Sequence, residues 1–136
     1  MRMAWLNAYE KHFRPFMDEE AWTLFRLAAY AEAGGWTLLI TGLGLKQFVL
    51  HGNNIPVLIA GQMHGTLFLV YIVACVVLYP SLRWSRAAAL LAGIASVPPY
   101  GSLVFEYLAN RHRQRAAIRR HSRLLLYRHF LQTAAA

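Results

Sequence analysis

The chain has 136 residues, of which 57% are hydrophobic and only 15% are charged, and its net charge is +8. Soluble proteins have about 25% charged residues, and a small domain cannot bury this much apolar surface on its own. The composition therefore excludes an ordinary soluble domain and predicts a small membrane protein with one domain at most.

The N-terminal residues 1–20 are predicted to form an interfacial amphipathic segment. Leu6, Tyr9 and Phe13 are spaced by three and four residues, so they share one face of a helix. A helix of this kind lies on lipid headgroups, and a flexible leader is the alternative. Charged residues at positions 10–14 occupy the place where a signal peptide has its apolar region, so we expect insertion to depend on the later spans.

Three long apolar runs follow, at Ala21–Leu45, Pro56–Tyr79 and Ala87–Leu108. A run of about 18 or more apolar residues is long enough to cross ~30 Å of hydrocarbon as a helix. The links between the runs are short, which favours antiparallel neighbours. Residues 21–108 are therefore predicted to be an all-α membrane domain of three transmembrane helices in an up-down-up bundle.

The third run contains two adjacent prolines, Pro98 and Pro99, followed by Tyr100 and Gly101. Proline removes a helix hydrogen bond and displaces the preceding turn. The sequence predicts a kink or an unwound break near Ile94–Gly101. A simple kink and a binding site beside a broken helix are both open interpretations.

The tail, residues 109–136, is predicted to be a basic helical extension in the cytoplasm. Seven of the 14 basic residues lie between positions 111 and 128. The tail is interpreted as a topology signal or as a site that docks on anionic lipid, with nucleic-acid binding ranked below both because basic tails are expected beside membrane spans. The residues expected to contact lipid headgroups are Arg111, Arg113, Arg115, Arg119 and Arg120.

The orientation follows from the distribution of basic residues around the three predicted spans. The side that holds Lys46 and the tail carries more of them than the side that holds the N-terminus. The positive-inside rule then places the C-terminus in the cytoplasm of a multi-pass protein. A further segment dipping into the membrane would reverse this assignment.

Glu32 and His64 are ionisable residues inside the first and second runs. At 1.5 Å per residue, Glu32 lies about 15 Å from Trp22, and His64 lies about 12 Å from Pro56, so antiparallel spans would bring both near the bilayer midplane. Such residues are costly in lipid unless they are paired, neutral or wet. Glu32, His64 and Arg26 form the candidate intramembrane polar site. Helix stapling by polar contacts and proton-linked or ligand-binding chemistry are both open.

Small residues and end charges give two further predictions. Gly61 and Gly65 form a small-x-x-x-small motif that allows another helix to approach closely, within the chain or in a dimer. Lys46 and Glu106 end spans one and three on the same side and are predicted to form an interfacial ion pair.

No metal or cofactor is expected, because the membrane region offers a single histidine and the tail histidines lack ligand spacing. Cys75 allows no intrachain disulfide and is interpreted as a small buried residue.

A set of short motifs, in this order and spacing, resembles the YdzA-like small integral membrane proteins of bacteria, a family classed as a domain of unknown function. The motifs are Phe25–Ala33, Gly44–Lys46, Gly61–Gly65 with Phe68, and Pro98–Gly101 with Phe105 and Glu106. The resemblance covers about Phe25–Leu108 and implies a bacterial inner-membrane protein of about three helices. It marks Arg26, Glu32, Lys46, His64, Gly65 and Gly101 as matching positions, and it implies no established activity.

Three functions remain open at this point. The preferred prediction is a non-enzymatic accessory subunit that packs against a larger membrane assembly or forms a homo-oligomer. The alternative is a small oligomeric transporter or ligand-binding protein that uses Glu32 and His64. An intramembrane enzyme ranks last, because no nucleophile or paired carboxylate converges with His64 by spacing, although Ser96 and Ser102 flank the proline break.

Overall fold

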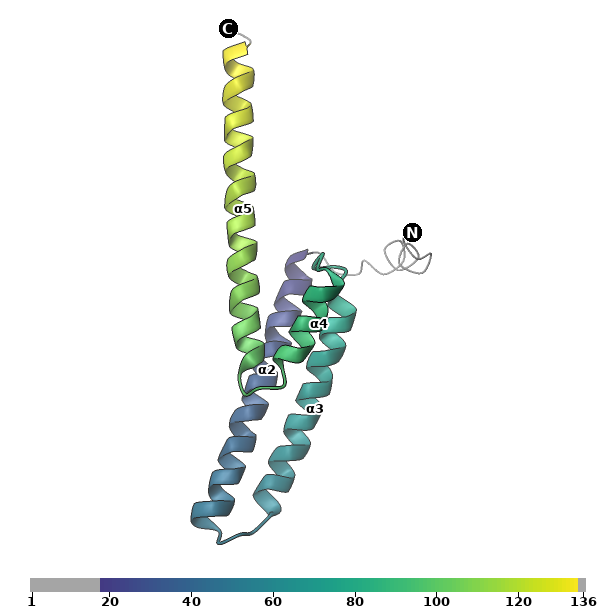
Figure 1. Ribbon diagram of the computed structural model, residues 1–136, viewed down its shortest axis with the longest axis vertical. Coiled ribbons are helices and arrows are strands. Elements are labelled where there is room, and N and C mark those ends of the chain that lie inside the picture. Colours follow the sequence, from purple (N-terminus) through teal and green to yellow (C-terminus); the bar gives the residue numbers. More distant parts are fainter. Residues whose placement is uncertain (1–17, 135–136) are drawn as a thin grey trace, which may run out of the picture. The chain divides into compact units, whose positions relative to one another are not determined.

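The computed structural model describes residues 18–134, and this part of the chain is helical (Figure 1). The predicted interfacial segment lies almost wholly outside the described residues. The helices are α2 (Asp18–Gly44), the π-helical turn η1 (Leu45–Val49), α3 (Ile55–Leu78), α4 (Arg86–Ala95) and α5 (Gly101–Ala134). The prediction of an all-α protein is confirmed. The chain forms two compact units, one that ends at Val104 and one that begins at Phe105.

Helix α2 begins at Asp18, with three acidic residues in its first turn, where negative charge interacts favourably with the helix dipole. Its buried side chains recur every three or four residues, which places them on one face. The buried residues of α2 are Ala21, Trp22, Phe25, Ala28, Ala29, Glu32, Ala33, Gly35 and Gly42.

A tight turn joins α2 to α3. His51 and Gly52 have positive φ values of 50° and 92°, and the side chain of Asn53 accepts a hydrogen bond from the Ile55 amide at 3.0 Å. Pro56 lies in the first turn of α3, where the missing N–H has no partner to lose.

Helices α2 and α3 lie side by side along their lengths (Figure 1). At one end Phe25 packs edge-on against Trp84, with ring centroids 4.8 Å apart, and also contacts Tyr71 at 5.9 Å. At the other end the backbones approach closely, because a Cβ on Gly42 would lie 3.0 Å from the Pro56 carbonyl oxygen. The seam is therefore held by aromatic rings at one end and by a small residue at the other.

The third predicted span is not one helix. Its first half, α4, has ten residues, which rise about 15 Å and cannot cross a bilayer of ~30 Å. Residues 96–100 form a turn, and α5 begins at Gly101. The predicted break is confirmed, and the physical reason is the Pro98–Pro99 pair, which cannot continue the ladder of helix hydrogen bonds.

Among residues 18–134, one helix, Ile55–Leu78, is both long and apolar enough to cross a membrane. Three transmembrane helices are therefore not confirmed. Large apolar side chains more than half exposed line the outer surface of this helix, namely Ile55, Leu58, Ile59, Leu69, Val70, Val73 and Val76. A surface of this kind fits contact with lipid or with another protein.

Candidate functional site

The candidate site lies at the middle of α2, where α3 and the break between α4 and α5 come together. Glu32 and Ser102 are both fully buried there. The Ser102 hydroxyl forms a hydrogen bond with the Glu32 carboxyl group through Oε2, and it also lies 3.3 Å from the carbonyl oxygen of Ala29. The first turn of α5 is thus fastened to the middle of α2 by polar contacts.

His64 approaches the same region from α3. Its ring lies 4.5 Å from the ring of Trp36, centroid to centroid, at an interplanar angle of 51°. It also contacts the backbone of α2, because a Cβ on Gly35 would lie only 3.0 Å from Nδ1. Gly35 therefore provides the space that lets the imidazole enter the seam between α2 and α3.

The two predicted polar residues do not pair. Glu32 bonds Ser102, His64 stacks on Trp36, and no hydrogen bond or ion pair joins Glu32 to His64 within residues 18–134. Oε1 of Glu32 and Nδ1 of His64 are buried without a hydrogen-bond partner in this part of the chain. Buried polar atoms of native proteins usually have partners, so these two atoms mark the place where the site has capacity to bind.

Polar contacts also hold the helix break against α2. The indole N–H of Trp36 donates to the Ser96 carbonyl oxygen at 3.4 Å, and the hydroxyls of Thr37 and Tyr100 lie 3.1 Å apart. The Trp36 bond satisfies one backbone carbonyl group of the break, and the Thr37–Tyr100 contact joins the side chains of α2 and the break.

Gly101 makes the break sterically possible. A Cβ at this position would overlap the Ala95 carbonyl oxygen and would lie 2.8 Å from Cγ of Pro98. Real Cβ atoms do not approach backbone so closely, so only glycine fits here.

Arg26, the third residue of the predicted polar site, contacts Tyr30 on its own helix. Its guanidinium carbon is 5.9 Å from the centre of the Tyr30 ring, as their four-residue spacing predicts. The predicted ion pair of Lys46 and Glu106 would join two separate compact units and remains a prediction. Lys46 lies in η1, and Glu106 is 5% exposed.

Gly61 and Gly65 do not lie in the contact with α2. A Cβ on either would meet nothing within 4 Å. They share a face of α3 with Ile72 and Val76, which line an apolar groove of about 540 Å³ between α3 and α4. Helix α4 lies beside one part of α3 only and stops midway along it (Figure 1).

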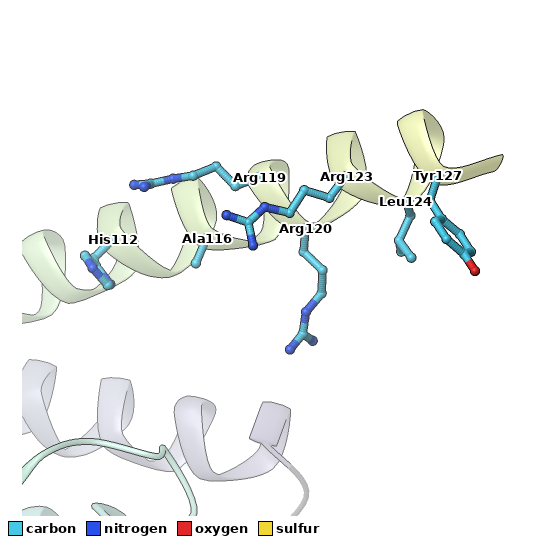
Figure 2. A pocket seen from close by; sticks show the side chains of 7 residues that line it. All are labelled: His112, Ala116, Arg119, Arg120, Arg123, Leu124 and Tyr127. Atoms are coloured by element: carbon cyan, nitrogen blue, oxygen red, sulfur yellow. The ribbon is translucent and has the colours of Figure 1, made fainter. Parts of the chain in front are cut away.

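The predicted lipid-contacting arginines lie on α5, which is continuous to Ala134. Figure 2 shows that Arg120, Leu124 and Tyr127 extend from the same side of this helix, together with His112. With Ala116, Arg119 and Arg123 they border a shallow hollow on α5 alone. The helical form of the basic tail is confirmed, and its contact with lipid stays a prediction.

The sequence did not predict the contacts that Gly35, Trp36 and Ser102 make in this site. Nothing in the sequence distinguishes Gly35 and Trp36 from the other small and apolar residues of the same run. Ser102 was noted only as a possible nucleophile beside the proline break. The available signal was the polar Ser102 just after the predicted break, because a hydroxyl in an apolar segment needs a hydrogen-bond partner. In residues 18–134 no group of three or more His, Cys, Asp or Glu side chains is placed to hold a metal ion.

Comparisons with known proteins agree with a membrane family. A Streptomyces coelicolor protein named "Putative membrane protein SCO5905" is 33% identical over 88 residues, which is 64% of this chain and 10% of that protein. The chain thus spans about a tenth of the length of this curated relative. No solved structure matches.

The resemblance to the YdzA-like family suggested by the motifs remains a prediction, whereas a membrane protein family without an assigned function is supported. The family model described as "Domain of unknown function (DUF3817)" matches residues 22–111. Since this match takes in α2, α3, α4 and the start of α5, the chain belongs to the DUF3817 family.

Proposed function

We propose that this protein is an accessory domain of the bacterial inner membrane that packs against a larger membrane protein, without catalysis of its own. The observation that carries the proposal is the part of α3 that no other helix of residues 18–134 covers. Within residues 18–134, a Cβ placed on Gly61 or Gly65 would meet no atom within 4 Å. A small-x-x-x-small surface lets a second helix approach closely and gain van der Waals contact in lipid.

The Streptomyces coelicolor relative supports the same function. The matching region makes up 10% of a protein whose name describes a membrane protein. In that protein the region is joined to a much longer chain. A domain that occurs inside a longer membrane protein fits a role as a packing module.

The test is co-purification from native membranes in a gentle detergent. The wild-type protein should migrate with a larger membrane protein, and the double variant Gly61→Leu, Gly65→Leu should lose that partner. Gly34→Leu is the matched control, because Gly34 also has open space around it but lies on α2. Migration of the wild-type chain alone, or a partner retained by the double variant, contradicts the proposal. If the protein assembles only with a second copy of itself, its function is to form a homo-oligomer and not to pack against a larger protein.

A reporter fused to the C-terminus tests the location of the tail. We expect a cytoplasmic C-terminus, because the basic residues of α5 should stay on the side of the membrane where positive charge is retained. A reporter active only outside the inner membrane would contradict this orientation.

Ligand binding at the buried polar site is the second candidate. The observation that favours it is the pair of buried atoms without partners, Oε1 of Glu32 and Nδ1 of His64. Any ligand should bind less tightly to the Glu32→Gln or His64→Ala variant, and unchanged binding in both would remove this candidate.

A further inference from the structure

Two possible acceptors lie within hydrogen-bond distance of the Ser102 hydroxyl, which has one hydrogen to donate. They are the Glu32 carboxyl group and the carbonyl oxygen of Ala29. A hydroxyl has a single hydrogen to donate, a carbonyl oxygen has none, and an ionised carboxylate only accepts. Both contacts are full hydrogen bonds only when Glu32 carries a proton and donates it to Ser102, which then donates its own hydrogen to Ala29.

The surroundings of Glu32 favour the same state. Its side chain is 0% exposed, and no ion pair reaches it within residues 18–134. An ionised carboxylate in such a place costs several kcal/mol unless a cation or several donors compensate it. Oε1 has no donor at all in this part of the chain, which a neutral carboxyl group tolerates far better than a charged one.

Several titratable or charged groups lie on the helices around Glu32. On α2 itself, Arg26 lies six residues before Glu32, and its guanidinium carbon is 5.9 Å from the centre of the Tyr30 ring. From α3, His64 and Tyr71 face this region; His64 stacks on Trp36, and the Tyr71 hydroxyl donates to the Ala92 carbonyl oxygen at 2.9 Å. Helix α4 has one charged residue, Arg86, at its first position. On α5 the first charged residue is Glu106, one turn after Ser102 in the sequence. On these helices no cation is bonded to Glu32, so a proton is the neutralising partner that the described geometry leaves.

We propose that Glu32 is a proton-binding site inside the membrane domain, and that its proton ties the middle of α2 to the first turn of α5 through Ser102. With the proton bound, the chain of hydrogen bonds runs from Glu32 to Ser102 to Ala29. Without it, Ser102 turns its only hydrogen to the carboxylate, and Ala29 loses the contact. The bound proton therefore stabilises the broken-helix arrangement, a property that does not depend on the proposed packing partner.

Infrared spectroscopy of the full-length protein in lipid nanodiscs at neutral pH tests this directly. The wild-type spectrum should contain the carbonyl stretch of a protonated carboxylic acid, which shifts in D₂O. Glu32→Gln should remove that band, since the amide keeps the shape of the neutral acid. Glu19→Gln, an exposed carboxyl on the same helix, should leave it unchanged. A carboxylate band lost in Glu32→Gln, with no carboxylic acid band lost, overturns the proposal.

A second measurement needs no variant. Dicyclohexylcarbodiimide is an apolar reagent that reacts with protonated carboxyl groups: the acid gives its proton to a carbodiimide nitrogen, and the carboxylate oxygen then adds to the central carbon. Peptide mapping of the treated wild-type protein should find at least ten-fold more adduct on Glu32 than on Glu19 or Glu20. Equal or lower modification of Glu32 overturns the proposal.

Discussion

The imidazole of His64 lies directly against the backbone of Gly35. A Cβ at residue 35 would stand 3.0 Å from Nδ1 and 3.2 Å from Cα of His64. The absence of a side chain at one position of α2 thus decides where the only histidine of α3 can lie. Because α2 and α3 form the main seam of the protein, this contact is a sensitive point for its stability.

Gly35→Ala should destabilise the protein by about 1–2 kcal/mol, since the added methyl group overpacks a contact that includes backbone. SDS-induced unfolding in mixed micelles measures this change. Gly34→Ala is the control, because its Cβ would meet nothing within 4 Å, and it should be neutral or slightly stabilising. Equal stability of the two variants would show that the seam is looser than described.

Gly101→Ala should have a larger effect, about 3 kcal/mol or more, because the new Cβ would collide with the Ala95 carbonyl oxygen. The same unfolding assay applies, and hydrogen exchange of residues 96–104 should rise. Gly44→Ala, with open space around it, serves as the comparison. If the Gly101→Ala protein has normal stability, residue 101 does not lie as close to the Ala95 carbonyl oxygen as described.

Ser102→Ala should lower the free energy of unfolding by about 1–3 kcal/mol, because the buried Glu32 carboxyl group loses its hydrogen bond to the serine hydroxyl. Ser122→Ala removes an exposed hydroxyl that bonds the Ile118 carbonyl oxygen within its own helix, so it should change stability very little. If the two alanine variants unfold alike, Ser102 has no special part in holding α5.

Tyr71→Phe should weaken the attachment of α4 to α3 by about 1 kcal/mol, because the buried hydroxyl donates to the Ala92 carbonyl oxygen. Faster hydrogen exchange of the α4 amides is the expected sign. Tyr107→Phe, which changes an exposed ring, should leave α4 unaffected. Unchanged exchange in Tyr71→Phe would refute this role of the hydroxyl.

The arginines of α5 should bind anionic lipid. Trypsin should cut after Arg119, Arg120 and Arg123 more slowly in nanodiscs with phosphatidylglycerol than in phosphatidylcholine, and high salt should remove the difference. At about 1 kcal/mol per basic residue, replacing all three by glutamine should weaken lipid contact by up to about 100-fold, read from protection at the remaining arginines. Equal cleavage in both lipids would leave the tail without this function.

Local sequence patterns predicted the approximate extents of α2 and α3 and the break in the third apolar run. The break at Pro98–Pro99 appears where the residues indicate, because the effect of a proline on a helix acts over a few neighbouring residues. The same patterns located Glu32 and His64 as the unusual residues of the apolar runs.

The sequence by itself therefore determined an all-α membrane protein, the approximate extents of its first two long helices and the depth of the polar residues along them. Only the tertiary structure decided that Glu32 bonds Ser102 and that His64 stacks on Trp36. Depth along a helix follows from a fixed rise per residue, whereas the partner of a side chain depends on how each helix is rotated and where its neighbour stops. The shortness of α4 and the bare backbone of Gly35 set those rotations and ends, and neither effect can be read from one helix alone.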